Sequence, residues 1–139
     1  MKFLLDTCVI SELIKTQPNS NVSDWISEQD ANMLYLSAIT WGELNRDIAK
    51  LPNGKRKEAL SLWAEQLKNS FQSRFWDFDN KIAEHWGRMT AQLEKQGLPM
   101  PTFDSMIAAT AHYHEALLVT RNTKDFQNTQ IRLINPWNP

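Results

Sequence analysis

Three short apolar runs constrain the fold of this chain more than any other feature of its sequence. They cover residues 3–5, 33–36 and 116–119. None of them alternates between apolar and polar residues, which is typical of strands buried on both faces of a parallel sheet. Residues 74–78 and 131–134 are two further strand candidates. The pattern predicts a mostly parallel sheet.

Segments with apolar residues at helical spacing separate these runs and predict helices. Asp79 is a candidate N-cap and Gly97 a candidate C-terminal stop of one of them. The expected helices cover residues around 9–14, 41–51, 55–70, 80–96 and 103–115. Alternating strands and helices predict one three-layer α/β domain over residues 1–139, with helices on both faces of the sheet.

Charge and cysteine usage exclude several classes of function. The formal net charge of −1 gives no general attraction to phosphate, so a nucleic-acid site must be a local patch. The only cysteine, Cys8, excludes an internal disulfide and a cysteine-based zinc finger. No apolar stretch approaches the roughly 18 residues that a membrane span needs. We therefore expect a cytoplasmic protein without membrane association.

Acidic residues follow the ends of the three clearest strands. Asp6 directly follows the first run, Glu43 lies one turn into the helix after the second, and Asp125 lies just beyond the third. Asp104 heads an apolar line on the last long helix, as Asp6 does on the first. Functional sites of parallel α/β folds gather at the carboxyl ends of the strands. We therefore expect these four carboxyl groups to converge.

Each acid also has a purely structural explanation. Asp6 and Asp104 are both candidate helix N-caps. Asp125 suits a turn, and Glu43 suits a solvated helix face. Only convergence of the four side chains separates a functional site from these explanations.

Converging carboxylates repel each other, and a divalent cation relieves that repulsion. An all-oxygen set without clustered His or Cys favours Mg²⁺ or Mn²⁺ over zinc. Such an ion activates water and neutralises phosphoryl charge, which favours phosphodiester hydrolysis.

Other reactive side chains offer weaker alternatives. Cys8 is a candidate thiol nucleophile with His85, His112 or His114 as its base, but a single cysteine on an apolar helix is usually a small core residue. His112 and His114 are about 200° apart on a helix and cannot flank one phosphate. A dehalogenase-type phosphatase needs a second Asp where this chain has Cys8.

Two surface features are candidate contact sites. Trp137, between Pro136 and Asn138, is a candidate cover for a dimer or partner surface. A group of basic residues is a candidate contact for an RNA backbone, although such runs are more often solvated helix starts. This group comprises Arg46, Lys50, Lys55, Arg56 and Lys57.

Four segments in order along the chain carry a family resemblance. They are LLDTCVISEL at 4–13, SAITWGEL at 37–44, PTFDSMIAATA at 101–111 and LVTRNTKDF at 118–126. They resemble the motifs of PIN-domain ribonucleases, specifically the VapC-type toxins of bacterial toxin–antitoxin pairs. The first motif of that family usually carries Asn after Asp-Thr, where this chain has Cys8, so the side chain that makes a polar contact near Asp6 in the family is missing here.

The resemblance implies a metal-dependent endoribonuclease in which Asp6, Glu43, Asp104 and Asp125 hold Mg²⁺ or Mn²⁺ and the attacking water. It also implies that Thr120 and Asn122 support these acids. It further implies a sheet of order 3-2-1-4-5, a homodimer, and a small cognate antitoxin whose C-terminal segment covers the active site. Substrates in the family are structured RNAs, often tRNA. The alternative from another class is a non-catalytic binding module whose acids dock a basic partner segment.

Overall fold

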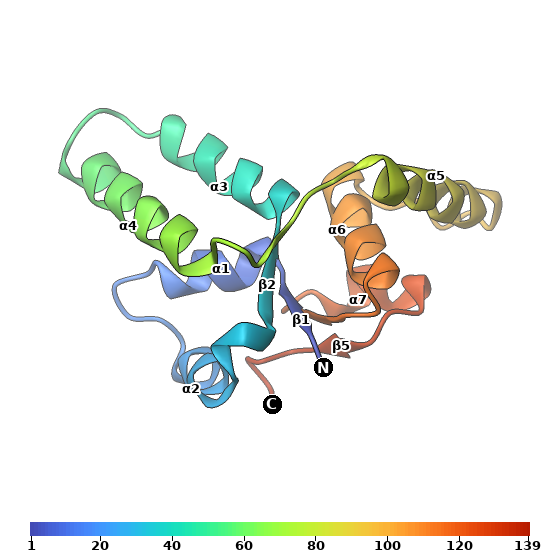
Figure 1. Cartoon of the computed structure of the whole chain (residues 1–139), viewed down its shortest axis with the longest axis horizontal. Helices are drawn as coiled ribbons and strands as arrows, with labels where there is room; N and C mark the ends of the chain where they lie inside the picture. The colour runs from blue at the N-terminus through green and yellow to red at the C-terminus, as the bar shows by residue number, and fades with distance from the viewer.

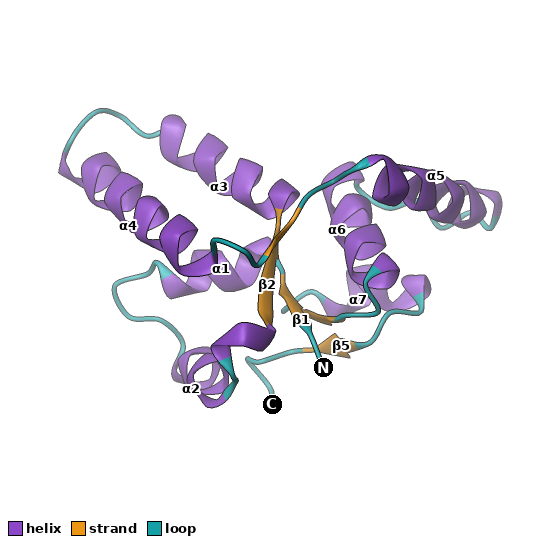
Figure 2. Ribbon diagram, viewed as in Figure 1, coloured by secondary structure: helices purple, strands orange, loops and turns teal.

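The computed structural model describes all 139 residues and shows helices packed on both faces of a five-stranded sheet (Figure 1; Figure 2). All four strand pairings are parallel, and the order is β3-β2-β1-β4-β5. The strands are β1 (Phe3–Leu5), β2 (Leu34–Ser37), β3 (Phe75–Trp76), β4 (Leu117–Val119) and β5 (Leu133–Ile134). The predicted fold class and strand order are confirmed, and the sheet is wholly rather than mostly parallel.

Seven α-helices connect and cover the strands. They are α1 (Thr7–Leu13), α2 (Ser20–Glu28), α3 (Ala38–Ala49), α4 (Lys55–Phe71), α5 (Asn80–Lys95), α6 (Thr102–Tyr113) and α7 (Thr123–Phe126). Two short 3₁₀ helices cover Ala31–Met33 and Gln127–Thr129. The predicted Asp79 cap is confirmed, because its side chain accepts a hydrogen bond from the Ile82 backbone. Gly97 follows the end of α5 with a φ of 72°, a conformation that favours glycine.

Helix α2 is not among the helices that the sequence pattern predicts. Its inward face carries Val22, Trp25 and Ile26 at helical spacing, and only Val22 is fully buried. The Asn19 side chain caps the helix by accepting hydrogen bonds from the backbone N–H groups of Asn21 and Val22. These are ordinary helix signals, and the polar residues around them concealed the short apolar stripe.

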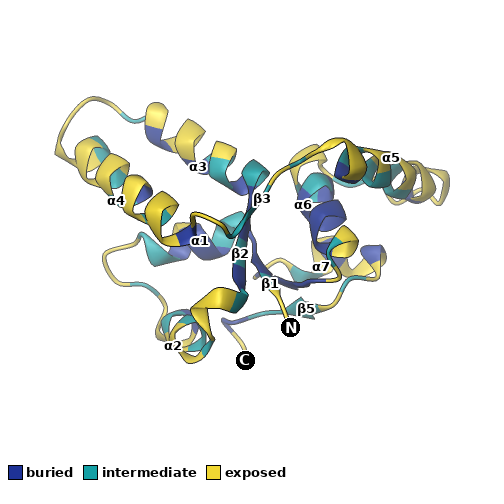
Figure 3. Ribbon diagram, viewed as in Figure 1, coloured by how far each residue is buried: buried dark blue, intermediate teal, exposed yellow.

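Two apolar cores lie on opposite faces of the sheet, because neighbouring residues of a strand point to opposite sides. Leu5 belongs to the core under α1, α2, α3 and α4, whereas Leu4 belongs to the core under α6 and α7. Helix α5 packs against α6 rather than on the strands (Figure 1). The central strands are accordingly the most buried part of the molecule (Figure 3).

Trp137 differs from its predicted role at a partner surface. Its side chain is only 8% exposed and packs into the core beside α1 and α2. Its backbone carbonyl accepts a hydrogen bond from Asn21 Nδ2, and the Arg121 guanidinium lies 5.4 Å from its ring centroid. Trp137 therefore fastens the last segment to the chain's own core. None of the helices combines the length and the hydropathy needed to cross a bilayer.

Candidate active site

Four acidic side chains gather at the carboxyl edge of the sheet. Asp6 directly follows β1, Glu43 lies in the second turn of α3, Asp104 lies in the first turn of α6, and Asp125 lies in α7 after β4. The pKa of the Asp104 carboxyl group is raised to about 6, mainly by burial. The negative charges of the other three acids each raise it further. We call these four residues the acidic cluster.

Asp6 is the buried member of the acidic cluster, with 4% of the residue exposed. Its Oδ1 accepts a hydrogen bond from the Thr7 backbone at 2.8 Å, so the predicted N-cap role is confirmed. Its Oδ2 accepts hydrogen bonds from Thr120 Oγ1 at 2.8 Å and from Cys8 Sγ at 3.6 Å. Burial raises the pKa of Asp6, and these donors oppose the shift. A carboxylate has about four acceptor positions, so Oδ1 retains one that is unused.

Asp104 does not cap its helix. The N-cap of α6 is Pro101, and no side chain makes a capping hydrogen bond there. The structural explanation of Asp104 as an N-cap is therefore wrong. The carboxyl groups of Asp104 and Asp125 make no hydrogen bond or ion pair with any other group of the chain. Their oxygens are free to bind something from outside.

Glu43 is held in place by a hydroxyl group from another helix. Thr7 Oγ1 donates a hydrogen bond to Glu43 Oε1 at 2.8 Å and lies 3.0 Å from Thr40 Oγ1. Thr40 is 1% exposed, whereas Thr7 and Glu43 are half-buried. Neither threonine is among the site residues predicted from the sequence. Thr7 adjoins Asp6 and Thr40 lies one helical turn before Glu43, which was the available signal.

Cys8 occupies the place of the family's Asn and makes polar contacts there. Its Sγ lies 3.6 Å from Asp6 Oδ2 and 3.5 Å from Thr120 Oγ1, and it accepts a hydrogen bond from the Arg121 backbone. Burial, together with the charge of Asp6, raises the pKa of the thiol to about 11. Cys8 is therefore a protonated donor to Asp6 at neutral pH, which argues against a thiol nucleophile.

The three histidines contact other residues and not Cys8. His85 Nε2 lies 2.7 Å from His112 Nδ1, and His114 stacks on Trp76 with ring centroids 3.9 Å apart. None of the three contacts the thiol, so the structure offers no base for the cysteine alternative.

Thr120 and Asn122 occupy different positions relative to the acidic cluster. Thr120 is fully buried and donates to Asp6. The backbone N–H of Asn122 donates in turn to Thr120 Oγ1 at 3.0 Å. The exposed side chain of Asn122 makes no hydrogen bond to any of the acids. Asn122 thus contacts the acids only indirectly, through its backbone.

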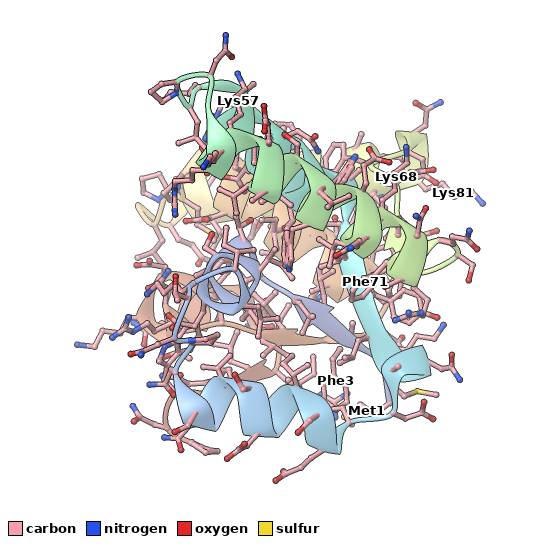
Figure 4. All side chains as sticks on the ribbon, turned by 90° about the vertical axis from the view of Figure 1, so that its left-hand side faces the viewer. Met1, Phe3, Lys57, Lys68, Phe71 and Lys81 are labelled. Carbon is pink, nitrogen blue, oxygen red and sulfur yellow. The ribbon has the colours of Figure 1, made fainter.

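The five predicted basic residues lie at different distances along α3 and α4. Arg46 neighbours Glu43 on the wall of one pocket. Lys50 is the C-cap of α3 and follows Glu43 by seven residues, which is roughly 10 Å at 1.5 Å per residue. Lys57 lies in the first turn of α4, close to the connection from α3 (Figure 4), and its Nζ donates a hydrogen bond to the backbone carbonyl of Ala49, the last residue of α3. Lys55 and Arg56 begin the same helix, so Arg46 is the one of the five that shares a pocket wall with a member of the acidic cluster.

The donor chemistry of the acidic cluster fits a hard divalent cation. No three His, Cys, Asp or Glu side chains lie close enough together to bind one metal ion in the present arrangement. Mg²⁺ keeps several waters and takes only one or two carboxylates directly, so a preformed cage of three ligands is not required. The unpartnered oxygens of Asp104 and Asp125 and the free position on Asp6 Oδ1 are donors of the kind that it prefers.

The chain is similar to several known proteins over nearly its whole length. A family model described as PIN domain matches residues 3–131. Toxin FitB of Neisseria gonorrhoeae is 37% identical over 96% of this chain and 97% of its own length. VapC ribonuclease Y4jK of Sinorhizobium fredii is 37% identical over 98% of each chain. A crystal structure of FitAcB from Neisseria gonorrhoeae aligns with a TM-score of 0.93 at 36% identity, over 99% of both chains.

Proposed function

We propose a function from the premise that this chain belongs to the PIN-domain family, in its group of VapC-type toxins of bacterial toxin–antitoxin pairs. The proposed activity is that of an endoribonuclease toxin that hydrolyses phosphodiester bonds and is neutralised by a cognate antitoxin. The finer proposal is that hydrolysis depends on Mg²⁺ or Mn²⁺ and that the substrate is a structured RNA, with tRNA as the first candidate. Cleavage of cellular RNA also implies action in the cytoplasm.

One observation carries this proposal. Four carboxyl groups come together from four separate segments, and two of them, Asp104 and Asp125, have no partner within the chain. The charges of the other three acids raise the pKa of Asp104, and the charge of Asp125 also raises the pKa of Asp6. Like charges gathered in this way destabilise a fold, so they are more typical of functional sites than of structural ones.

The chain's own residues organise the site before any ligand binds. Thr7, Cys8 and Thr120 orient the Asp6 carboxyl group and leave Oδ1 able to accept one further contact. Thr7 also holds Glu43 by Oε1. In the absence of a cation, Asp104 carries a proton in about half of the molecules near pH 6.

The residues that would hold the cation are Asp6, Glu43, Asp104 and Asp125. The chemistry that Mg²⁺ or Mn²⁺ supplies in such a site is activation of a water molecule and neutralisation of charge on a phosphoryl oxygen.

Substitution within the acidic cluster tests the proposal. We expect Asp104→Asn to reduce RNA cleavage by about a hundredfold or more, because it removes an ionisable group beside the reacting phosphate. Asp24→Asn is the matched control, since Asp24 is an exposed acid on α2. Chelation of divalent ions should abolish cleavage by the parent protein, and Mn²⁺ should restore it. Equal cleavage by Asp104→Asn and the control would refute the assignment.

Experiments on the same proteins distinguish an enzyme from a non-catalytic binding module. A module whose acids dock a basic segment would bind a basic peptide in the presence of chelator and would cleave no RNA with added Mn²⁺. Sequencing of RNA 5′ ends after brief expression would identify the substrate. Co-expression with the neighbouring reading frame, followed by light scattering, would test for the antitoxin complex and for the proposed homodimer.

A further inference from the structure

A small open pocket lies beside the acidic cluster and shares Glu43 with it. Its volume is about 190 Å³. It lies between α3 and α6, which contact each other and flank the carboxyl end of β2 (Figure 2). Its lining residues are Ala38, Ile39, Gly42, Glu43, Arg46 and Phe103. Glu43, a member of the acidic cluster, therefore forms one wall of the pocket, and Phe103, which directly precedes Asp104, forms another.

Phe103 presents an aromatic ring to solvent in this pocket. It is 43% exposed, and only four other large apolar residues of the chain are exposed. It directly precedes Asp104 in the first turn of α6, so its position is coupled to that of the carboxyl group. A single exposed apolar residue is unremarkable on a protein surface, but this one shares a pocket with Glu43 and with the positively charged Arg46.

The guanidinium group of Arg46 is the positive charge beside the Phe103 ring. Its guanidinium carbon lies 5.6 Å from the centroid of the Phe103 ring, within the range of a cation–π contact. Its only acidic partner is Asp47, at 3.8 Å on the surface, and such exposed pairs contribute little. The guanidinium therefore keeps donors that are free to bind a phosphate.

Gly42 adds no side chain to its wall of the pocket. A Cβ atom built at this position would meet no other atom within 4 Å. The helix surface between Ala38 and Arg46 is thus low, which leaves the space in front of the Phe103 ring accessible to a flat group.

We propose that Phe103 and Arg46 form a base-stacking subsite that holds one unpaired nucleotide of the RNA beside the acidic cluster. A ring face next to a guanidinium is a combination that stacks bases and contacts the backbone phosphate. Bases within an RNA duplex are not accessible to such a ring, so the ligand is a single-stranded loop or bulge. The subsite rests on the proposed function, because it concerns the RNA that the acids cleave.

Binding without turnover tests this subsite separately from the nuclease activity. The Asp104→Asn variant serves as background, with chelator present, and the probe is a fluorescent hairpin RNA with a single-stranded loop. Fluorescence anisotropy gives its Kd. We expect Phe103→Leu to weaken binding by about tenfold and Phe103→Trp to restore it, because every aromatic ring can stack on a base. Gly42→Leu should weaken binding to a similar extent by filling the pocket.

The control variant is Tyr113→Leu. Tyr113 is 41% exposed at the far end of the same helix, so the substitution likewise removes an aromatic ring of similar exposure. We expect it to bind the probe as the parent does. A probe with abasic nucleotides throughout the loop should bind the parent and Phe103→Leu equally.

Three results would overturn the subsite. One is equal Kd values for Phe103→Leu and Tyr113→Leu. Another is a loss of affinity in Phe103→Leu that is the same for the abasic probe. The third is a Phe103→Leu variant that loses only a protein contact, either with the antitoxin or with a second copy of the chain, while RNA binding is unchanged. Failure of the parent protein to cleave any RNA in Mn²⁺, with the stacking result intact, would instead reject the nuclease assignment alone.

Discussion

The carboxyl group of Asp104 shows at the scale of a single residue how a functional site costs stability. Its pKa is raised by burial and by three neighbouring acids, and no donor within the chain offsets that shift. Asp6 experiences the same burial effect, but three donors oppose it. The two aspartates therefore differ in their hydrogen-bond donors. An external cation would stabilise the charged form of Asp104 more than that of Asp6.

Removal of the Asp104 charge should stabilise the protein in the absence of metal. A raised pKa in the folded state means that this group favours folding below its unfolded pKa near 4, and that this contribution is lost as the pH rises through about 6. Because the group is partly exposed to solvent, we expect Asp104→Asn to raise the free energy of unfolding at pH 7.5 by only about 1 kcal/mol.

Urea denaturation in chelator at pH 7.5 and pH 4 measures this effect. The gain should shrink at pH 4, where the parent carboxyl group is protonated in the folded state. A loss of stability, or a gain of equal size at both pH values, would contradict the electrostatic origin of the shift.

Cys8 should be unreactive in the folded protein. With its thiol pKa raised to about 11, the thiolate fraction at pH 8 is lower by on the order of a hundredfold than in an unfolded chain. Alkylation by iodoacetamide, followed by mass spectrometry, should therefore be slower by a similar factor in buffer than in denaturing urea. Equal rates would show that the thiol is neither buried nor held by Asp6.

At the scale of elements, the site depends on contacts between helices that begin at neighbouring strand ends. Helix α1 begins at Thr7 and α3 at Ala38, directly after β1 and β2. Parallel strands bring both starts to one edge of the sheet, so a hydroxyl on the first helix reaches a carboxylate on the second. The position of Glu43 is thus set by two helices together.

Loss of the hydrogen bond from Thr7 to Glu43 should impair catalysis more than folding. We expect Thr7→Val to lower kcat by about tenfold, the equivalent of one hydrogen bond, with little change in KM. Thr7→Ser keeps the hydroxyl group and should retain most of the activity. Steady-state cleavage of one defined RNA by the two variants compares them directly. An active Thr7→Val variant would mean that Glu43 needs no support from α1.

At the scale of the whole molecule, residues near the C-terminus pack against the first two helices, α1 and α2. Trp137 packs into the core beneath α1 and α2, and its backbone carbonyl binds the side chain of Asn21. The contact joins segments more than a hundred residues apart, so it depends on the complete fold.

Truncation of this tryptophan should therefore lower global stability. We expect Trp137→Ala to reduce the free energy of unfolding by about 3 kcal/mol, as for other large buried aromatic side chains. Deletion of the exposed Asn138 and Pro139 should leave the melting temperature within a few degrees of the parent value. Calorimetry of both variants checks this prediction, and similar losses in the two would show that the ring contributes little.

Local sequence determined much of this protein. The unbroken apolar runs at 3–5 and 116–119 predicted buried parallel strands, because such runs suit a sheet covered on both faces. Asp79 and Gly97 marked the ends of α5 because capping and positive φ are local requirements. Asp6, Glu43 and Asp125 are identified by their positions after strands, and Asp104 by its place at the head of an apolar line on a helix. Helix α2 was missed although its signals were equally local.

Tertiary structure alone decided what surrounds those acids. The hydroxyl groups of Thr7 and Thr120 reach carboxylates 36 and 114 residues away, and no spacing in the sequence encodes such contacts. The same holds for the placement of Arg46, but not of Lys55 to Lys57, beside the acidic cluster, and for the burial of Trp137 in the chain's own core. Periodicity reports which face of an element is buried, whereas the partners on that face are chosen by packing between elements distant in the chain.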